Sequence, residues 1–240
     1  MTNREKKFTF LLILIVVGAA IYYLVKYDIL LIDVKDGVNL LVVFGTVGMT
    51  LMIIYVEVIR PWIQKPEIKI EFANKRPYCR HAKTKSSSRP YYCHFAVVNS
   101  GKTLTDDCEA VLERVWDSSN EKKNSKWEEW ENFIPCNLKW SAENPKEDFK
   151  RACFKTIYPG ERRYFCDIGR VNEKHDTFNF ELSRFFLSQV NYLSRGKHKI
   201  QISVYSKNAA KVTKKFVIDW CGEWKGTQPE MEEGLKIKML

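Results

Sequence analysis

The sequence lacks several patterns that identify common catalytic and metal-binding folds. Segments with strand-like periodicity do not alternate with helical segments, which argues against a parallel α/β sheet. Cysteine and histidine do not occur at the C-x₂₋₄-C and H-x₃₋₅-H spacings of common zinc sites. No recognised nucleic-acid-binding motif is present. No long apolar run follows residue 59, so any membrane-spanning helix is confined to the N-terminal part.

Two apolar runs occur within the first 59 residues. Residues 8–25 and 38–56 contain 18 and 19 residues without a charged side chain. At about 1.5 Å per helical residue each run spans roughly 27–29 Å, close to the ~30 Å hydrocarbon core of a bilayer. The alternatives are buried helices of a soluble fold or, for the first run, a cleaved signal peptide, whose apolar core is usually shorter. We predict a two-helix transmembrane anchor over residues 1–59, with helices at about 8–25 and 38–59.

The distribution of lysine and arginine predicts the orientation of these helices. The tail before the first run has three basic residues, and six more lie between residues 60 and 80. The connecting loop has two, accompanied by three aspartates. Because basic residues favour the cytoplasmic side, we predict an integral membrane protein with two spans and both termini in the cytoplasm. Arg60 and Trp62 fit an anchor at the membrane interface.

The seven cysteines agree with this orientation. All of them lie beyond residue 78, and their number is odd. A cysteine-rich extracytoplasmic domain would usually pair its thiols in disulfides. We therefore expect reduced, buried thiols in a cytoplasmic domain.

The remainder of the chain has the periodicity of β-strands. Ile68, Ile70 and Phe72 alternate with charged residues, and segments of the same kind follow, separated by turn-forming sequences. Strands are predicted at 68–72, 91–99, 107–116, 162–168, 198–206 and 211–220, with 136–141 and 153–158 as weaker candidates. Such a series without alternating helices predicts an all-β antiparallel sandwich.

The predicted sandwich occupies residues 67–222, after a juxtamembrane linker at 60–66 and before a flexible tail at 223–240. Two segments depart from the strand pattern. The charged residues 117–135, with Trp127 and Trp130 three apart, predict a short helical insertion. Residues 180–193 have apolar side chains at helical intervals and are a candidate crossover helix.

Three segments resemble known immunoglobulin-like modules: FAVVNSGKTLTDDCEAVLERVW, IYPGERRYFCDI and GKHKIQISVYSKNAAKVTKKFVIDW. Their Asn-x-Gly and Pro-Gly-Glu turns are similar to those of CARDB (cell-adhesion-related) sandwiches, and the resemblance covers about residues 66–222. The chain also resembles uncharacterised prokaryotic proteins with two membrane helices and a cytoplasmic sandwich. The resemblance implies an immunoglobulin-like fold and a binding or connecting role, and it carries no catalytic residue across, since function does not follow from fold.

Residues 96–103, AVVNSGKT, fit the loose phosphate-loop pattern after a strand. In that interpretation Lys102 and backbone N–H groups would bind phosphates and Asp219 would help to hold Mg²⁺. The loop has one glycine, however, and β-branched valines resist the required backbone conformation. A turn between two antiparallel strands explains the same residues, and we favour it.

Cys79, His81, Cys93 and His94 are soft metal ligands on neighbouring segments. Adjacent residues of a strand point to opposite faces, so Cys93 and His94 should not converge on one ion. We therefore expect buried thiols and surface imidazoles in place of a zinc site, and predict no metal.

The positive charge is concentrated after the apolar runs. Residues 1–59 contain five basic and five acidic side chains, so the net charge of +10 belongs to the rest of the chain. It is densest in a basic segment of residues 75–90 that has no acidic side chain. Its basic residues are Lys75, Arg76, Arg80, Lys83, Lys85 and Arg89. This segment is a solvated loop, a contact with anionic lipid headgroups, or a site for an anionic ligand.

We interpret the chain as a membrane-anchored cytoplasmic β-sandwich that binds or scaffolds a partner without catalysis and without a cofactor. The alternative is a ligand-gated membrane effector or sensor, in which the sandwich binds an anionic signal such as a nucleotide and the helices oligomerise. Gly45 and Gly48 permit close helix contact in such a homo-oligomer, although they do not form a GxxxG motif. An enzyme is the third interpretation.

The predicted orientation can be tested with a membrane-impermeant thiol reagent. The seven cysteines should stay unlabelled in intact cells, because the membrane separates them from the reagent. After lysis and unfolding of the protein the same thiols should react. Labelling of any cysteine between Cys79 and Cys221 from outside intact cells would contradict both the orientation and the expectation of reduced thiols.

Overall fold

The computed structural model describes residues 37–82, 89–118, 126–141, 143, 146, 148–173, 175–183 and 191–240. The chain divides into two compact units, Met1–Ile63 and Gln64–Leu240. The division falls within the predicted linker at 60–66, so the β-rich unit begins close to the predicted boundary at residue 67.

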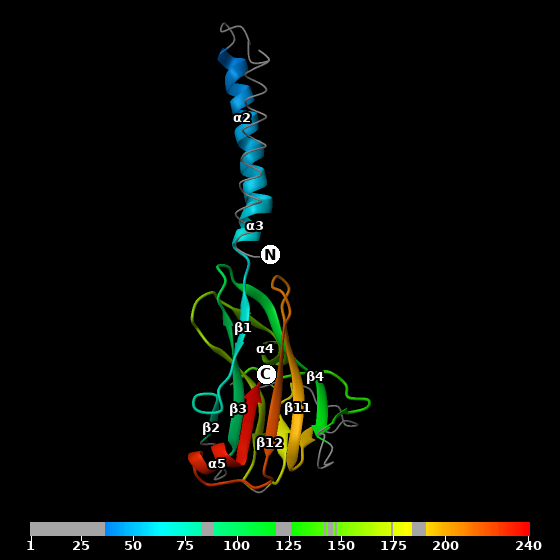
Figure 1. Cartoon of the computed structure of the whole chain (residues 1–240). Helices are drawn as coiled ribbons and strands as arrows, with labels where there is room; N and C mark the ends of the chain where they lie inside the picture. The colour runs from blue at the N-terminus through cyan, green and yellow to red at the C-terminus, as the bar shows by residue number, and fades with distance from the viewer. Residues whose placement is uncertain are drawn as a thin grey trace. The chain divides into compact units, whose positions relative to one another are not determined.

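The described part of the first unit is helical (Figure 1). It consists of α2 (Gly37–Ile54), the π-helix η1 (Tyr55–Ile59) and α3 (Arg60–Ile63). The second predicted helix, 38–59, is therefore confirmed as a helix, whereas the first, 8–25, lies outside the described residues. None of the helices in the described ranges is both long enough and apolar enough to cross a membrane.

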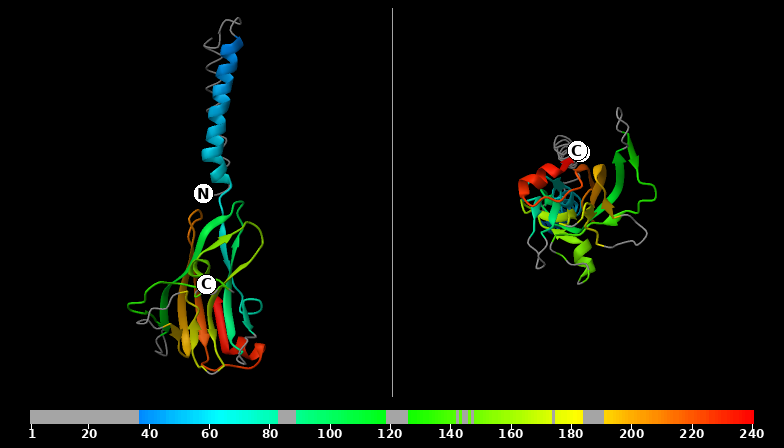
Figure 2. Two further views of the ribbon diagram at one scale, coloured as in Figure 1. Left: turned by 180° about the vertical axis from the view of Figure 1, so that it is seen from behind. Right: turned by 90° about the horizontal axis from the view of Figure 1, so that it is seen from below.

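The second unit contains two antiparallel sheets, which Figure 2 shows in two further views. The first has the order β1-β3-β8-β9-β10, and β2 pairs with β3 beside β1. Its strands are β1 (Ile68–Glu71), β2 (Cys79–His81), β3 (Tyr91–Asn99), β8 (Tyr164–Val171), β9 (Phe178–Phe180) and β10 (Tyr192–Leu193).

The second sheet has the order β13-β12-β11-β4-β5, and β6 and β7 also pair with β4. Its strands are β4 (Thr105–Ser118), β5 (Trp127–Glu129), β6 (Cys136–Asn137), β7 (Lys155–Ile157), β11 (Gly196–Tyr205), β12 (Val212–Trp220) and β13 (Leu235–Met239). Buried side chains of both sheets form one hydrophobic core, so the predicted antiparallel two-sheet architecture is confirmed.

The alternation of side chains explains how each sheet faces the core. In β12, Phe216, Ile218 and Trp220 are buried while the residues between them are at least partly exposed, as expected of a strand with one solvated face. In β3, all residues except Tyr92 are buried, so this strand is covered on both faces. All seven cysteines are free thiols, and only Cys221 is partly accessible.

The segment after β6 passes from one sheet to the other. Cys136 and Asn137 pair with β4, whereas Trp140 forms a bridge with Cys166 of β8. The indole N–H of Trp140 donates to the carbonyl oxygen of Cys153 at 3.0 Å, so this buried ring has its polar atom satisfied. The crossing closes one side of the sandwich and places Lys139 and Ser141 beside β8.

The expected flexible tail at 223–240 is wrong. These residues contain α5 (Gln228–Gly234) and β13, with Met231, Leu235 and Ile237 buried in the core. Leu235 and Ile237 alternate with lysines, which is the pattern of a half-buried strand. The Asn74 side-chain amide donates to the Leu235 carbonyl oxygen at 3.3 Å and so links the first sheet's β1–β2 connection to this edge.

The prediction of a helix within 117–135 is also wrong for the residues of this range that the structure describes. Trp127–Glu129 forms β5 and pairs with β4, because Trp127 lies opposite Ser118 in the register. A short helix occurs instead at α4 (Phe149–Cys153), which the Asp148 side chain caps by accepting from the Arg151 backbone N–H. The proposed crossover helix at 180–193 begins in β9 and ends in β10, and residues 184–190 between them lie outside the described ranges.

The Asn-Ser-Gly sequence forms a structural turn. The buried Asn99 side chain donates to the carbonyl oxygens of Thr103 at 2.7 Å and Ile157 at 3.2 Å, and accepts from the Gly101 backbone N–H at 3.0 Å. A phosphate loop leads into a helix, whereas this turn leads into β4. These contacts support a turn at residues 96–103, although the strands that it joins, β3 and β4, lie in different sheets and do not pair with each other.

Gly101 is required by close packing. A Cβ atom at Gly101 would lie 2.5 Å from the backbone nitrogen of Glu67 and 2.5 Å from the carbonyl oxygen of Lys65. The Gly101→Val substitution should therefore reduce the free energy of unfolding by about 1–3 kcal/mol, as overpacking generally does. The exposed neighbour Lys102 gives a matched control, because Lys102→Ala should change the free energy of unfolding by less than ~0.5 kcal/mol. Urea unfolding of the full chain, followed by tryptophan fluorescence, measures both, and equal stabilities for the two variants would contradict this account.

Candidate functional site

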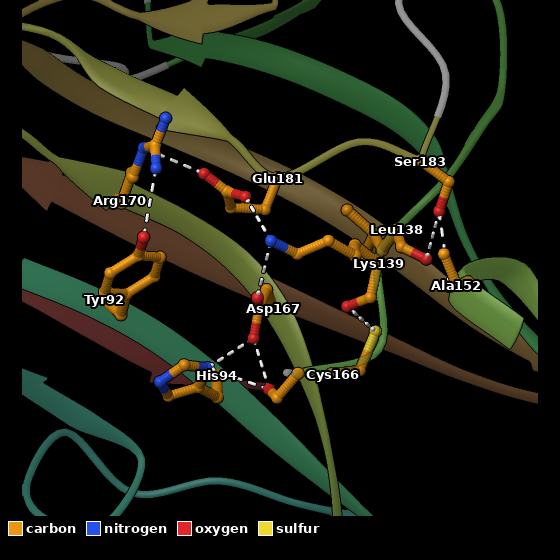
Figure 3. Close-up of polar contacts among 11 residues, drawn as sticks. Tyr92, His94, Leu138, Lys139, Ala152, Cys166, Asp167, Arg170, Glu181 and Ser183 are labelled. Carbon is orange, nitrogen blue, oxygen red and sulfur yellow. Dashed lines mark hydrogen bonds and ion pairs between the residues drawn. The ribbon is translucent and has the colours of Figure 1, made fainter. Parts of the chain in front are cut away.

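A buried carboxylate lies on the face of the first sheet that is turned away from the core. Asp167 of β8 is 3% exposed, and its Oδ1 is 2.6 Å from Nδ1 of His94 on β3 (Figure 3). The Ser141 hydroxyl also donates to this oxygen, and Lys139 Nζ lies 3.5 Å from Oδ2. Both carboxylate oxygens are therefore paired, as burial of a charge requires.

The network continues along the same face (Figure 3). Lys139 Nζ is 2.8 Å from Glu181 Oε2, so the ammonium group lies between two carboxylates. Arg170 donates to the Tyr92 hydroxyl at 3.0 Å. Its Nε is 2.9 Å from Glu181 Oε1, an ion pair whose N–H direction does not satisfy hydrogen-bond geometry. The two carboxylates are thus balanced by two cations before His94 is counted.

The register of β3 and β8 brings His94 and Asp167 together. Cys93 pairs with Gly169, whereas the next residue, His94, pairs with Asp167, so Ile168 is the extra residue of a β-bulge. Directly opposite residues of an antiparallel pair share one face of the sheet. The bulge therefore sets His94 and Asp167 on the same face.

Asp167 and Lys139 each stabilise the charged form of the other, and the pKa of each is shifted accordingly. Burial alone raises the pKa of Asp167, but the hydrogen bond from His94, the charge of a protonated His94, the hydrogen bond from Ser141 and the charge of Lys139 outweigh it, and the pKa is lowered. Burial lowers the pKa of Lys139, and the nearby carboxylates of Glu181 and Asp167 reverse this effect, so the pKa is raised. Asp167 is thus held ionised at neutral pH.

Ser141, His94 and Asp167 have the composition of a nucleophilic triad without its geometry. In a triad the serine hydroxyl bonds to the histidine nitrogen that is opposite the one facing the aspartate. Here the Ser141 hydroxyl lies 3.2 Å from Nδ1, the nitrogen that already faces Asp167. The hydroxyl therefore has no base at Nε2, and the arrangement positions the imidazole ring without activating the serine.

A small pocket opens beside this cluster. It has a volume of about 80 Å³ and is lined by Pro77, Arg80, His94, Ser141 and Phe165. Pockets for whole small molecules usually measure about 300–1,000 Å³, whereas a water molecule occupies about 30 Å³. The pocket therefore has room for one terminal group of a few atoms.

The two ring nitrogens of His94 have different surroundings. Nδ1 faces Asp167, whereas Nε2 is buried and has no hydrogen-bond partner among the described residues. The ring itself is 6% exposed and stacks on Tyr92, with 7° between the ring planes. A buried polar atom without a partner costs about 1–3 kcal/mol. Nε2 is thus a buried polar atom of a pocket-lining residue that the described part of the protein leaves unsatisfied.

The basic segment contributes one residue to this pocket. Lys75, Arg76, Arg80 and Arg89 are exposed, and within the described ranges none of them forms an ion pair with an acidic side chain. Of these four, Arg80 alone is among the residues that line the pocket. Lys83 and Lys85 lie outside the described residues.

The predicted interface anchor belongs to the first unit. Arg60 begins α3, and Trp62 lies within it, although the position of the Trp62 side chain is outside the described part of the chain. The role of these two residues at a membrane interface stays a prediction.

The four soft ligands do not form one centre. Cys79 and Cys93 lie opposite each other on β2 and β3 and are buried in the core, whereas His94 is on the other face with Asp167. Among the described residues, no group of three or more His, Cys, Asp or Glu side chains is arranged to hold a metal ion.

The sequence analysis singled out Arg80 and missed Ser141 and Asp167. It expected His94 to be a surface imidazole, which is wrong, because the residue is 6% exposed. A signal was present, because His94 and Asp167 are titratable residues within otherwise apolar strands, YYCHFAVV and YFCDI. Such residues must find partners when the strands are buried.

Comparison with known proteins finds no protein family, no curated protein and no solved structure that this chain matches.

The buried charge of Asp167 predicts a pH-dependent contribution to stability. At neutral pH, Asp167→Asn should reduce the free energy of unfolding by about 3–5 kcal/mol, because it leaves the cations around it without their counter-charge. The pKa of Asp167 is lowered on folding, so this contribution is complete above the unfolded-state pKa of about 3.9 and is lost as the pH falls below it. Urea unfolding at pH 7 and at about pH 3 should show the difference between wild type and variant shrinking in acid.

The control is Asp148→Asn in α4. Asp148 forms an exposed ion pair with Arg151, and asparagine can still cap the helix. This variant should change the free energy of unfolding by less than about 1 kcal/mol at either pH. Equal effects of the two substitutions at pH 7 would contradict the assigned role of Asp167.

Proposed function

We propose that this protein is a membrane-anchored, non-catalytic binding module whose immunoglobulin-like sandwich binds an anionic group in the pocket beside His94. The anchor, the cytoplasmic orientation and the CARDB-like identity are predictions from the sequence. The observation that carries the binding proposal is the pocket itself. An arginine without an ion pair in the described structure, Arg80, and a histidine with an unpartnered buried nitrogen, His94, line the same small cavity.

The charge around the pocket supports an anion as the ligand. Lys75, Arg76 and Arg89 belong to the same basic segment as Arg80 and have no acidic partner in the described ranges. The cations on the other side of His94, by contrast, are already balanced by Asp167 and Glu181. An anion near Arg80 would therefore meet a positive charge that no ion pair among the described residues offsets.

The size of the pocket restricts what enters it. About 80 Å³ admits a phosphate, sulfate or carboxylate group but not an entire nucleotide. Arginine suits such groups because its planar guanidinium donates paired hydrogen bonds to two oxygens. The remainder of the ligand would lie outside the pocket, so a dissolved monoester and a phospholipid headgroup present the same chemistry.

Conservative arginine substitutions test whether the pocket binds the anion. Glycerol phosphate should bind the full chain in detergent, and Arg80→Lys should weaken its binding about tenfold or more, because lysine loses the paired hydrogen bonds. Arg76→Lys and Arg89→Lys are matched controls that keep the charge of the same segment, and they should bind as wild type does. Isothermal titration calorimetry measures the four affinities.

Vesicles distinguish the source of the phosphate. Stronger binding to phosphatidic acid, which has a terminal phosphate, than to phosphatidylglycerol at equal surface charge would identify a lipid headgroup as the ligand. Binding to dissolved glycerol phosphate without a preference between the two lipids would identify a dissolved ligand. Equal effects of the three arginine substitutions, with binding that fades as salt rises, would instead indicate a diffuse charged surface and overturn the pocket.

A further inference from the structure

The hydrogen bond to Asp167 determines what the other nitrogen of His94 offers to a ligand. Asp167 is held ionised and can only accept, so Nδ1 carries the hydrogen of the 2.6 Å contact. In a neutral ring Nε2 is then a lone pair. It donates to an anionic oxygen only after the ring takes up a second proton.

A second buried histidine of the protein has different surroundings at the corresponding nitrogen. His198 also places Nδ1 2.6 Å from a carboxylate, that of Asp117, and is 4% exposed. Its Nε2, however, is 2.8 Å from the carbonyl oxygen of Ser194. Both ring nitrogens of His198 therefore have partners within the protein, whereas one nitrogen of His94 does not.

The charges that face His94 come from several elements. Asp167 on β8 favours a proton on the ring, whereas Arg80 on β2 and Lys139, behind Asp167, oppose it. Tyr92 on the same strand and Phe165 on β8 contribute ring contacts, and Ser141 contributes a neutral hydroxyl. A dianion next to Arg80 and His94 would reverse this balance, because it offsets the charge of Arg80 and attracts the proton.

We infer that the pocket binds a tetrahedral dianion together with a proton, which Nε2 of His94 carries. A carboxylate needs only Arg80, since its single charge is matched by one guanidinium. A sulfate or a phosphate monoester dianion has two charges and several acceptor oxygens, which match Arg80 and a doubly protonated His94. Binding and protonation are then reciprocally linked, so each makes the other more favourable. This inference depends on the anion site proposed above and specifies the ligand chemistry of that site.

Sulfate is the probe that tests this inference, because it remains a dianion across the pH range in which imidazoles change charge, about 5–8. Isothermal titration of the full chain in two cationic amine buffers that differ in ionisation enthalpy measures proton uptake directly. We expect the wild type to take up a proton when it binds sulfate. Its affinity should fall as the pH rises, by at most about tenfold per pH unit, which is the limit for one proton.

Two histidine variants give the comparison. His94→Gln keeps a side-chain hydrogen-bond donor near Asp167 and should bind sulfate more weakly, without proton uptake and without this pH dependence. The matched control is His198→Gln, which alters the histidine whose Nε2 already has a partner and should behave as wild type does.

The outcomes separate this inference from the proposed function. Wild type that binds sulfate without proton uptake would overturn the inference and leave the anion site in place. Proton uptake that persists in His94→Gln or disappears in His198→Gln would also overturn it. Failure of the wild type to bind sulfate and glycerol phosphate at any pH would overturn both. The buffer comparison on the wild type needs no variant, so the test holds even if His94→Gln does not fold.

Discussion

The burial of the Asp167 carboxylate is the constraint on which the candidate site depends. An ionised carboxylate that is 3% exposed needs partners for both oxygens, since the desolvation of an unpaired charge costs several kcal/mol. The partners come from separate parts of the chain: His94 from β3, and Lys139 and Ser141 from the crossing segment. The Asp167 carboxylate thus links two neighbouring strands to the segment that joins the two sheets.

The segments that close the two sides of the sandwich also help to hold this cluster in place. On one side, Trp140 and its neighbours cross from β4 to β8, and on the other, Asn74 bonds to the edge of β13. The hydrogen bond from the Trp140 indole to Cys153 anchors the crossing segment in the core, so the adjacent Lys139 and Ser141 face Asp167. Paired edges also leave fewer backbone groups available to other chains.

The candidate site combines a rigid part with an accessible part. His94 is held by Asp167 and by stacking on Tyr92, so its ring has one orientation before any ligand arrives. Arg80 is exposed on the short strand β2 and has no acidic partner within the described ranges. Because the His94 ring is already held in place, less side-chain ordering is needed on binding. Arg80 supplies the positive charge. The His198 contacts show that the fold can satisfy both nitrogens of a buried histidine, whereas Nε2 of His94 has no partner among the described residues.

The two-sheet antiparallel architecture could be predicted from the amino-acid sequence, since the period-two alternation in segments such as 68–72 and 211–220 depends only on which residues must be buried. The sequence also indicated the basic segment and Arg80, because charge composition is local information. The sequence did not reveal that residues 223–240 form a helix and a strand, since Leu235 and Ile237 are buried by partners far away in the sequence. The site itself was decided by the tertiary structure. A bulge between β3 and β8 sets His94 opposite Asp167, and a crossing segment brings Ser141 to them although it is 47 residues from His94 and 26 from Asp167 in the sequence. The register of β3 and β8 and the path of the crossing segment cannot be read from local sequence, because they arise only when strands that are distant in the chain pair with one another.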